Sequence, residues 1–298
     1  MRRTGRASFS RSLSGAHTPF ALSTGDELRP VAKSLMPSHY ASREFQVQAE
    51  ELVRLSAGLT DEQKMLAEYW SETPESPLAP ARWSKFAQWI SGRDHHSLDD
   101  DVKMFFVLNN ALLDASIAAS DLKREFNSIR PITAITLLSN EKRIRSWGGP
   151  GKGTVEMEGS HWIPYQPATS PMPPSPDYVS ETSTYAAAAA WILNSWTGTD
   201  HFGYSVAIPA GNSIIEPGVT PAHAIVLQWG TFGDAANAAG MSGRYAGINF
   251  PNYDLAGRRL GRLVGEKVWA KAQEYFSGAS KPLTFSELHS SAAPTHMR

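Results

Sequence analysis

Residues 173–193 read PPSPDYVSETSTYAAAAAWIL, a proline-rich approach that leads directly into an alanine-rich stretch. Proline breaks helices, whereas alanine has the highest helix propensity of the common residues. The pattern predicts a loop that gives way to a helix over residues 183–196. Because alanine side chains are small, this helix can pack closely against its neighbours.

Other helices are predicted on both sides of this stretch. Thr60 and Gln63 form a capping box, which predicts a helix that continues to about residue 73. From Asp99 to about Phe126, apolar residues recur every three or four positions and predict one long helix with a single buried face. That face carries Val102, Phe105, Phe106, Asn109, Leu112, Leu113 and Ile117. Three more helices are predicted over residues 80–90, 220–239 and 255–276.

Beta-strand patterns are scarce, because almost no segment alternates polar and apolar residues. The predicted fold class is therefore all-α, a single helical bundle over residues 45–276. Within it, residues 146–177 carry repeated glycines and prolines, which predict a long loop at one end of the bundle. Roughly thirty structureless residues are uncommon inside a compact domain and are often functional.

The two ends of the chain differ from this domain. Residues 1–25 are rich in arginine and serine and contain no acidic residue. Two interpretations stay open for them, a transit-like segment for an organelle or a basic tail. Residues 277–298 are rich in serine, alanine and proline and predict a loose C-terminal tail.

The composition excludes several kinds of chemistry. The 298 residues include no cysteine, so disulfides, thiolate metal sites and thiol catalysis are excluded. A formal net charge of −1 gives no reason to expect nucleic acid as a partner. The longest apolar run, Ala186–Leu193, is far shorter than the roughly 20 residues of a membrane span, so no span is expected.

Three segments resemble one known family. Residues 121–135 read DLKREFNSIRPITAI, in which six residues separate a lysine from Arg-Pro. Residues 173–193 resemble a segment that has Ser-Gly-His-Ser-Thr at positions 180–184. Residues 229–261 read WGTFGDAANAAGMSGRYAGINFPNYDLAGRRLG and resemble a segment with Ser-Arg and, six residues later, a histidine. In order and spacing the three resemble the vanadium-dependent haloperoxidases and their acid phosphatase and type 2 phosphatidic acid phosphatase relatives.

The resemblance implies a helical bundle fold and, as the family chemistry, peroxide-dependent oxidation of halide on bound vanadate. A tetrahedral oxyanion needs converging hydrogen-bond donors. In the family these are a lysine, two arginines, a serine hydroxyl and a glycine N–H, while one histidine bonds vanadium and another is the general acid–base. Lys123, Arg130 and Ser180 match the lysine, the first arginine and the serine.

The other matched positions are substituted. Glu181 stands at the glycine position, Thr182 at the acid–base histidine, Gly243 at the second arginine and Asn249 at the vanadium-bonding histidine. Arg244 follows directly and is a candidate to replace the missing arginine. Threonine cannot exchange protons near neutral pH as histidine does, and an amide is a poor ligand for a centre that takes imidazole.

These substitutions predict a degenerate site without haloperoxidase activity, in a protein that was repurposed as a small-molecule enzyme or binding protein. Two alternatives are a non-catalytic structural or interaction subunit, and a still-active haloperoxidase or phosphatase. No cofactor is expected, with vanadate or phosphate as the alternative. The expected partner is a small molecule or an oxyanion, and the resemblance implies a homodimer or larger assembly.

Two residues are candidates for the missing acid–base chemistry. The Glu181 carboxylate can pair with Lys123 or Arg130 and close the old oxyanion pocket, or it can act as a new general acid–base. His161, in the glycine- and proline-rich loop, is the other candidate acid–base residue.

Two further patterns invite a site interpretation that the residues do not support. His95 and His96 precede three aspartates at residues 99–101, but a helix N-terminus explains acidic residues there, so no metal site is expected. Residues 148–153, GGPGKG, resemble a phosphate-binding loop only superficially, because no serine or threonine follows the lysine.

Overall fold

A computed structural model describes residues 18–33, 39–40, 42–71, 79–169 and 172–279, and the outer parts of both predicted tails lie outside these ranges. The helices are α1 (Arg29–Lys33), α2 (Arg43–Ala57), α3 (Asp61–Trp70), α4 (Ala79–Asp94), α5 (Leu98–Phe126), α6 (Pro131–Leu138), α7 (Glu181–Thr197), α8 (Phe232–Tyr245) and α9 (Pro251–Phe276), with a short 3-10 helix, η1 (Gly159–His161). The strands are β1 (Arg143–Trp147), β2 (Thr154–Glu158), β3 (His201–Ile208) and β4 (Ile225–Thr231). The predicted all-α helical bundle is confirmed.

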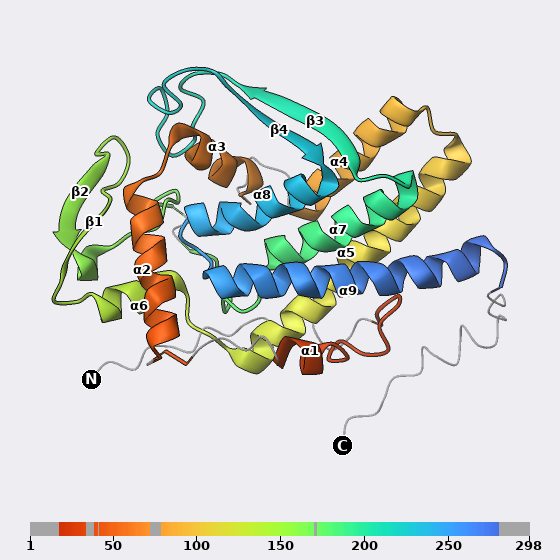
Figure 1. The fold of residues 1–298 in the computed structure, drawn as a ribbon, viewed down its shortest axis with the longest axis horizontal. Coiled ribbons are helices and arrows are strands. Elements are labelled where there is room, and N and C mark those ends of the chain that lie inside the picture. Colours follow the sequence, from red (N-terminus) through yellow and green to blue (C-terminus); the bar gives the residue numbers. More distant parts are fainter. Residues whose placement is uncertain (1–17, 34–38, 41, 72–78, 170–171, 280–298) are drawn as a thin grey trace.

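The alanine-rich helix α7 lies at the centre of the bundle, with α5, α8 and α9 packed around it (Figure 1). Its alanines are buried, and the face of α9 that meets α7 carries glycines. A Cβ atom at Gly265 would lie 2.8 Å from the Cβ of Trp191, and one at Gly261 would overlap the carbonyl oxygen of Thr184. Small residues on both helices therefore allow the backbones to approach closely.

The long helix α5 buries a different face from the one predicted. Leu112 and Ile117 are buried, but Val102 is 59% exposed, Phe106 38% and Leu113 41%. The buried face is formed by Met104, Val107, Leu108, Ala111, Ala115 and Ala118. Both faces are apolar, and the small alanines form the one that fits against α7.

The predicted helix over residues 220–239 is wrong in its first half. Residues 225–231 form β4, which pairs antiparallel with β3, and α8 begins only at Phe232. Thr231 caps α8 in a capping box with Asp234, so the chain cannot continue a helix through this point. A second hairpin, β1–β2, lies within the region predicted as a long loop. The N-terminal helix α2 was not predicted.

The described part of the predicted N-terminal tail lies against the domain. The backbone N–H groups of Phe20, Ala21 and Leu22 donate to the buried carboxylate of Asp114 on α5, at 2.6, 2.7 and 3.1 Å. A little further on, Arg29 pairs with Asp121 at 2.5 Å.

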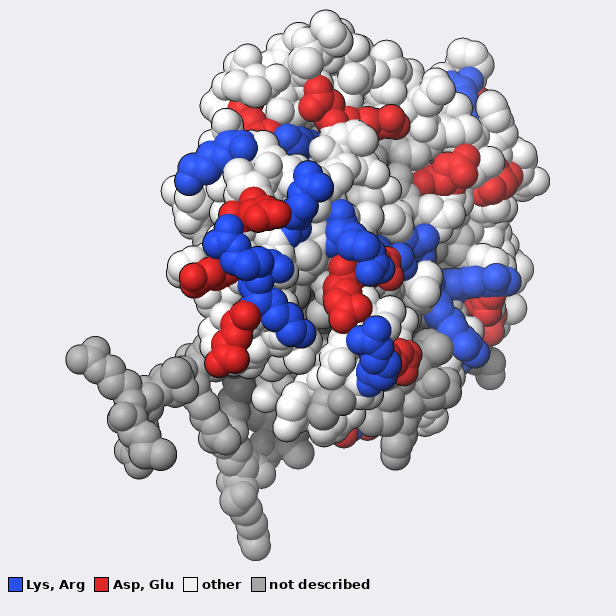
Figure 2. Space-filling model, turned by 60° about the vertical axis from the view of Figure 1, so that its left-hand side comes forward, with Lys and Arg blue, Asp and Glu red and all other residues white. Residues whose placement is uncertain are grey.

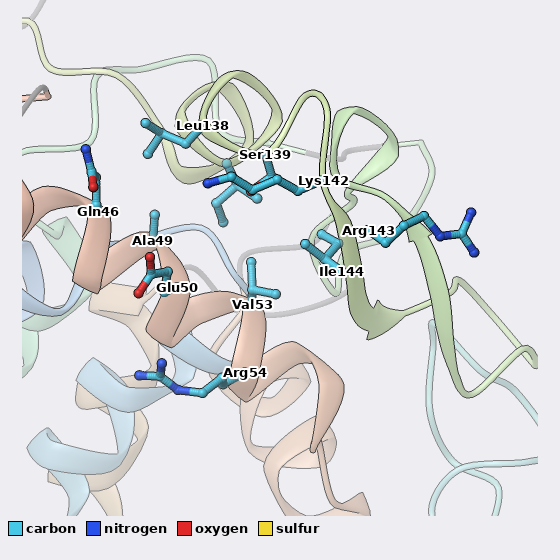
Figure 3. A pocket seen from close by; sticks show the side chains of 11 residues that line it. Gln46, Ala49, Glu50, Val53, Arg54, Leu138, Ser139, Lys142, Arg143 and Ile144 are labelled. Carbon is cyan, nitrogen blue, oxygen red and sulfur yellow. The ribbon is translucent and has the colours of Figure 1, made fainter.

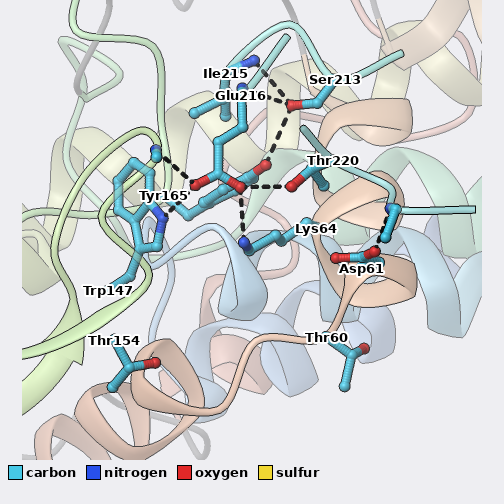
Figure 4. Close-up of polar contacts among 12 residues, drawn as sticks. Thr60, Asp61, Lys64, Trp147, Thr154, Tyr165, Ser213, Ile215, Glu216 and Thr220 are labelled. Carbon is cyan, nitrogen blue, oxygen red and sulfur yellow. Dashed lines mark hydrogen bonds and ion pairs between the residues drawn. The ribbon is translucent and has the colours of Figure 1, made fainter. Parts of the chain in front are cut away.

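A buried carboxylate fastens the long connection between β3 and β4 to α3 and the β1–β2 hairpin (Figure 4). Glu216 is 3% exposed and accepts hydrogen bonds from the Lys64 amine (2.7 Å), the Trp147 indole (3.0 Å) and the Thr220 hydroxyl (2.8 Å). Burial opposes ionisation, but these partners outweigh it and lower the pKa of Glu216. The ionised carboxylate thus joins three segments that are distant in sequence.

One stretch, Leu98–Leu138 in α5 and α6, is long and apolar enough to cross a membrane by composition alone. In its most apolar window, 56% is buried inside the domain, as in the core helix of a folded domain. Figure 2 brings the left-hand side of Figure 1 toward the viewer. On this face, lysines and arginines are interspersed with acidic residues.

Candidate functional site

Lys123 lies in the last turn of α5 and is 1% exposed. Its amine donates to the carbonyl oxygen of Pro176 at 2.6 Å and to that of Asp177 at 3.4 Å. Burial lowers the pKa of Lys123 to about 8, although the nearby Glu181 carboxylate opposes the shift. The amine therefore points at the backbone of the proline-rich segment before α7.

Arg130 caps the N-terminus of α6 directly before Pro131, in the extended conformation that proline favours in the preceding residue. Its Nε donates to the Ser175 carbonyl (2.8 Å). Nη1 donates to the Ile248 carbonyl (2.9 Å) and the Asp177 carboxylate (3.4 Å). Nη2 donates to the Ser175 hydroxyl (3.0 Å) and the Pro176 carbonyl (3.3 Å). A guanidinium has five N–H donors. All five have an acceptor within the protein.

Asp177 is the carboxylate that forms an ion pair with Arg130. It is fully buried and accepts hydrogen bonds from the Asn249 side-chain amide and from the backbone N–H of Phe250 at 3.2 Å. Burial raises the pKa of Asp177, against the opposing effects of Arg130 and Lys123. Asp177 was not predicted as a site residue, although it is the only acidic residue between Pro173 and Ser180.

The hypothesis that Glu181 closes the site by pairing with Lys123 or Arg130 is not supported. Within the described ranges, Glu181 forms no ion pair with either cation. The segment just before α7 places Asp177 and its neighbouring carbonyl groups against the two cations, whose N–H groups donate to these oxygens and not to Glu181 at the start of the helix.

Ser180 and Arg244 belong to a second buried network. Ser180 caps α7, and the hydroxyl of Ser183 lies 2.9 Å from the Ser180 hydroxyl and 2.8 Å from the carboxylate of Asp254. Asp254 also pairs with Arg258 at 2.7 Å and with Arg244 at 2.8 Å. Arg244 is thus engaged by a carboxylate on α9 and, among the described residues, forms no hydrogen bond or ion pair with the groups that bind Lys123 and Arg130.

Three of the substituted positions line one small cavity of about 70 Å³ between α3, α7 and α8. They are Glu181, Thr182 and Gly243, and the other polar side chains of the wall belong to Trp70, Ser71, Gln166 and Ser242. The indole N–H of Trp70 is buried and has no hydrogen-bond partner within the described residues. A space of this size admits a few water molecules or a small polar group.

Gly243 also packs directly against Asn249, the fourth of these positions. A Cβ atom at Gly243 would overlap the side-chain oxygen of Asn249. A longer side chain at position 243 is therefore incompatible with the present position of Asn249, whose amide is held by Asp177.

The remaining candidates lie outside this region. His161 is exposed at the end of η1 and does not line the cavity beside Glu181. Residues 148–153 form the turn between β1 and β2, where Gly149, Gly151 and Gly153 have positive φ. In the part of the chain that the structure describes, no group of three or more histidine or acidic side chains is placed to hold a metal ion.

A family model for the second helical-bundle domain of VCPO, the vanadium chloroperoxidases, matches residues 103–278. The chain belongs to the vanadium haloperoxidase family. The match covers α5 to α9, the elements that carry Lys123, Arg130 and all the substituted positions. No curated protein matched the chain.

Solved structures of this haloperoxidase family share the fold. A bacterial vanadium-dependent chloroperoxidase matches in its holo form with a TM-score of 0.73 at 24% identity over 82% of this chain, and in its apo form with 0.77 at 22% over 87%. A bacterial vanadium-dependent iodoperoxidase matches with a TM-score of 0.65 at 21% identity over 85%. The chain spans only about half the length of these proteins, 52% to 55%.

Proposed function

We propose that this protein keeps the vanadium haloperoxidase fold but binds a small polar molecule in place of vanadate and does not oxidise halides. One observation carries the proposal: every N–H donor of Arg130 already has an acceptor within the protein. A vanadate oxygen would have to displace a backbone carbonyl or the Asp177 carboxylate to reach this guanidinium.

The charge around the two cations also argues against an oxyanion. The buried Asp177 side chain already lies 3.4 Å from the Arg130 guanidinium, so an oxyanion would have to displace it. Asn249 offers an amide that is already bonded to Asp177, and Thr182 offers a hydroxyl in place of an imidazole. The residues present do not fit vanadate.

The cavity beside Glu181 suits a different ligand. A carboxylate, a threonine hydroxyl and a glutamine amide are among the groups that line it, together with the Trp70 side chain. Glu181 is the first residue of α7, where the helix dipole favours a negative charge. We assign Glu181 the role of binding a cationic or hydrogen-bond-donating group, or of exchanging a proton with it.

The test is a thermal-shift titration of the purified protein with orthovanadate and, separately, with phosphate. A ligand at a hundredfold excess over its dissociation constant adds about 2.7 kcal/mol to the free energy of unfolding. We expect no rise in melting temperature with either anion, and no bromide oxidation by peroxide beyond that of free vanadate. A rise in melting temperature that is lost in Lys123→Met would overturn the proposal.

A second candidate function, a structural or interaction subunit, is favoured by the apolar residues that α5 exposes. Leu98 is 81% exposed and Val102 59%, on one side of the helix four residues apart. If this side of α5 meets a second copy of the chain, light scattering should give the mass of a dimer, and Val102→Glu should reduce it to that of a monomer. A monomeric wild-type protein excludes this self-association and leaves the small-molecule role.

A further inference from the structure

A larger cavity of about 500 Å³ lies between α2, α6 and the start of β1 (Figure 3). None of the residues discussed above for vanadate or for the small cavity lines it. Pockets that hold drug-sized molecules range from roughly 300 to 1,000 Å³. The cavity is therefore large enough for a whole small molecule rather than for a few waters.

Aliphatic side chains from all three elements form one part of the wall. Ala49 and Val53 come from α2, Ile135 and Leu138 from α6, and Ile144 from β1. A ligand that covers these groups removes apolar surface from water, which contributes roughly 25 cal/mol per Å². This part of the cavity selects an apolar body.

The polar part of the wall carries an excess of positive charge. Lys142, Arg54 and Arg143 line the cavity together with a single carboxylate, Glu50. Glu50 already pairs with Arg43 at 3.2 Å, outside the cavity wall. In the described part of the chain, neither Lys142 nor Arg54 has an ion-pair partner, so both charges are available to a ligand.

Of the cations, Lys142 is the best placed. In Figure 3 its side chain runs back beside Ser139 and holds its amine on the α2 side of the cavity, whereas Arg143 points away from it. Arg143 also lies 3.9 Å from Glu156 on the neighbouring strand. The last carbonyl groups of α6 end at Ser139 and carry partial negative charge, which disfavours a doubly charged phosphate more than a single carboxylate.

We propose that this cavity binds an apolar organic acid, with the aliphatic body against Val53, Leu138 and Ile144 and the carboxylate at Lys142. The site is independent of the proposed ligand cavity beside Glu181, because the two share no lining residue. It gives the protein a second small-molecule site, which is selective for singly charged anions.

The experiment is isothermal titration of the full-length protein with decanoate below its micelle-forming concentration. We expect saturable binding to one site, with dissociation constants at least tenfold weaker for Leu138→Trp, which fills the cavity, and for Lys142→Glu, which reverses its charge. Arg145→Glu is the matched control, because Arg145 is exposed on β1, three residues after Lys142, and does not line the cavity. Its affinity for decanoate should equal that of the wild type, and circular dichroism should show that all three variants are folded.

Decanol and decylamine test the charge recognition with the same apolar body. Both should bind at least tenfold more weakly than decanoate. Equal binding of the three compounds, equal weakening by Lys142→Glu and Arg145→Glu, or no saturable binding of decanoate would each overturn the proposal.

Discussion

At the scale of single residues, the buried pair of Arg130 and Asp177 is the main ion pair at the candidate site. Removing one partner from a buried ion pair leaves an uncompensated charge and typically costs about 3 to 5 kcal/mol. We expect Asp177→Asn to lower the free energy of unfolding by an amount in this range, measured by urea denaturation. Added phosphate should then stabilise the variant, because the cations have lost their carboxylate.

The control for Asp177 is Asp200→Asn. Asp200 is exposed, although it also accepts hydrogen bonds, from Asn194 at 3.1 Å and Gly233 at 3.3 Å. Its loss should cost about 1 kcal/mol or less. If both variants lose the same small amount and phosphate stabilises neither, Asp177 does not have the role assigned to it.

Lys123 makes the stability of the fold depend on pH. Its pKa is lowered from 10.5 to about 8, so between these values the folded protein has released a proton that the unfolded chain still binds. Stability contributed by this group therefore rises as the pH increases from about 8 to 10.5. Relative to Lys123→Met, the wild type should gain on the order of 2 kcal/mol over this window.

Urea denaturation at several pH values between 7 and 10 measures this difference. Lys142→Met is the control, because Lys142 is exposed, and its curve should run parallel to that of the wild type. Parallel curves for Lys123→Met and the wild type would show that Lys123 titrates at its ordinary pH in the folded protein.

The residue types at this site were predictable from spacing, whereas their partners were not. Lys123 and Arg130 were identified because six residues separate them in a segment that resembles the family. Asp177 was missed because nothing in a proline-rich segment indicates which way one carboxylate will point. Glu181 was predicted to pair with Lys123 or Arg130 from its position in the sequence, which likewise does not indicate where its carboxylate points.

At the scale of elements, the contact between α7 and α9 depends on glycine. A Cβ atom at Gly261 would overlap the Thr184 carbonyl and lie 2.9 Å from the Cβ of Ala187. Gly261→Ala must push the helices apart, and overpacking of this kind costs roughly 1 to 3 kcal/mol. We expect a lower melting temperature in differential scanning calorimetry.

Gly92→Ala on α4 is the matched substitution. Position 92 is exposed, helical and has no atom within 4 Å of the new Cβ, so the change should stabilise the helix by up to about 1 kcal/mol. Opposite signs for the two variants are expected. A lower melting temperature in both would mean that the effect of Gly261→Ala does not arise from the helix contact.

Periodicity predicted most helices but not the faces that they bury. On α5, Val102 and Phe106 continue an apolar stripe as regular as the one made by Val107 and Ala111. Tertiary contact with α7 selects between the two, and no local pattern contains that contact. The start of α8 was missed for a related reason, because Ile225–Thr231 is short enough to suit a helix or a strand until β3 pairs with it.

At the scale of the whole molecule, the described residues form one large core and one small satellite. The large core runs from Leu22 to Ala272, whereas the satellite is built from five residues at the loop end of the bundle, Ala67, Trp147, Tyr165, Ile215 and Ala246. The satellite depends on the hydrogen bonds of Glu216 for its position. Few apolar contacts hold it, so this end should open before the bundle unfolds.

Glu216→Gln tests that order by hydrogen exchange. The amides of Ser213 and Gly218, bonded across the connection at 2.8 and 2.9 Å, should exchange at least tenfold faster than in the wild type. Amides in α7 should keep their protection. Glu266→Gln, which alters an exposed ion pair on α9, should change the exchange of neither set of amides. Uniformly faster exchange across the bundle in Glu216→Gln would show that the satellite has no independent stability.

The acceptors around Arg130 are set mainly by the path of the backbone. Three of the five are backbone carbonyl oxygens, from Ser175, Pro176 and Ile248, and every amino acid carries that group. No exchange of side chains at those positions removes them. Freeing this guanidinium for a ligand therefore requires a different path of the backbone before α7, and not only a change of the side chains at these three positions.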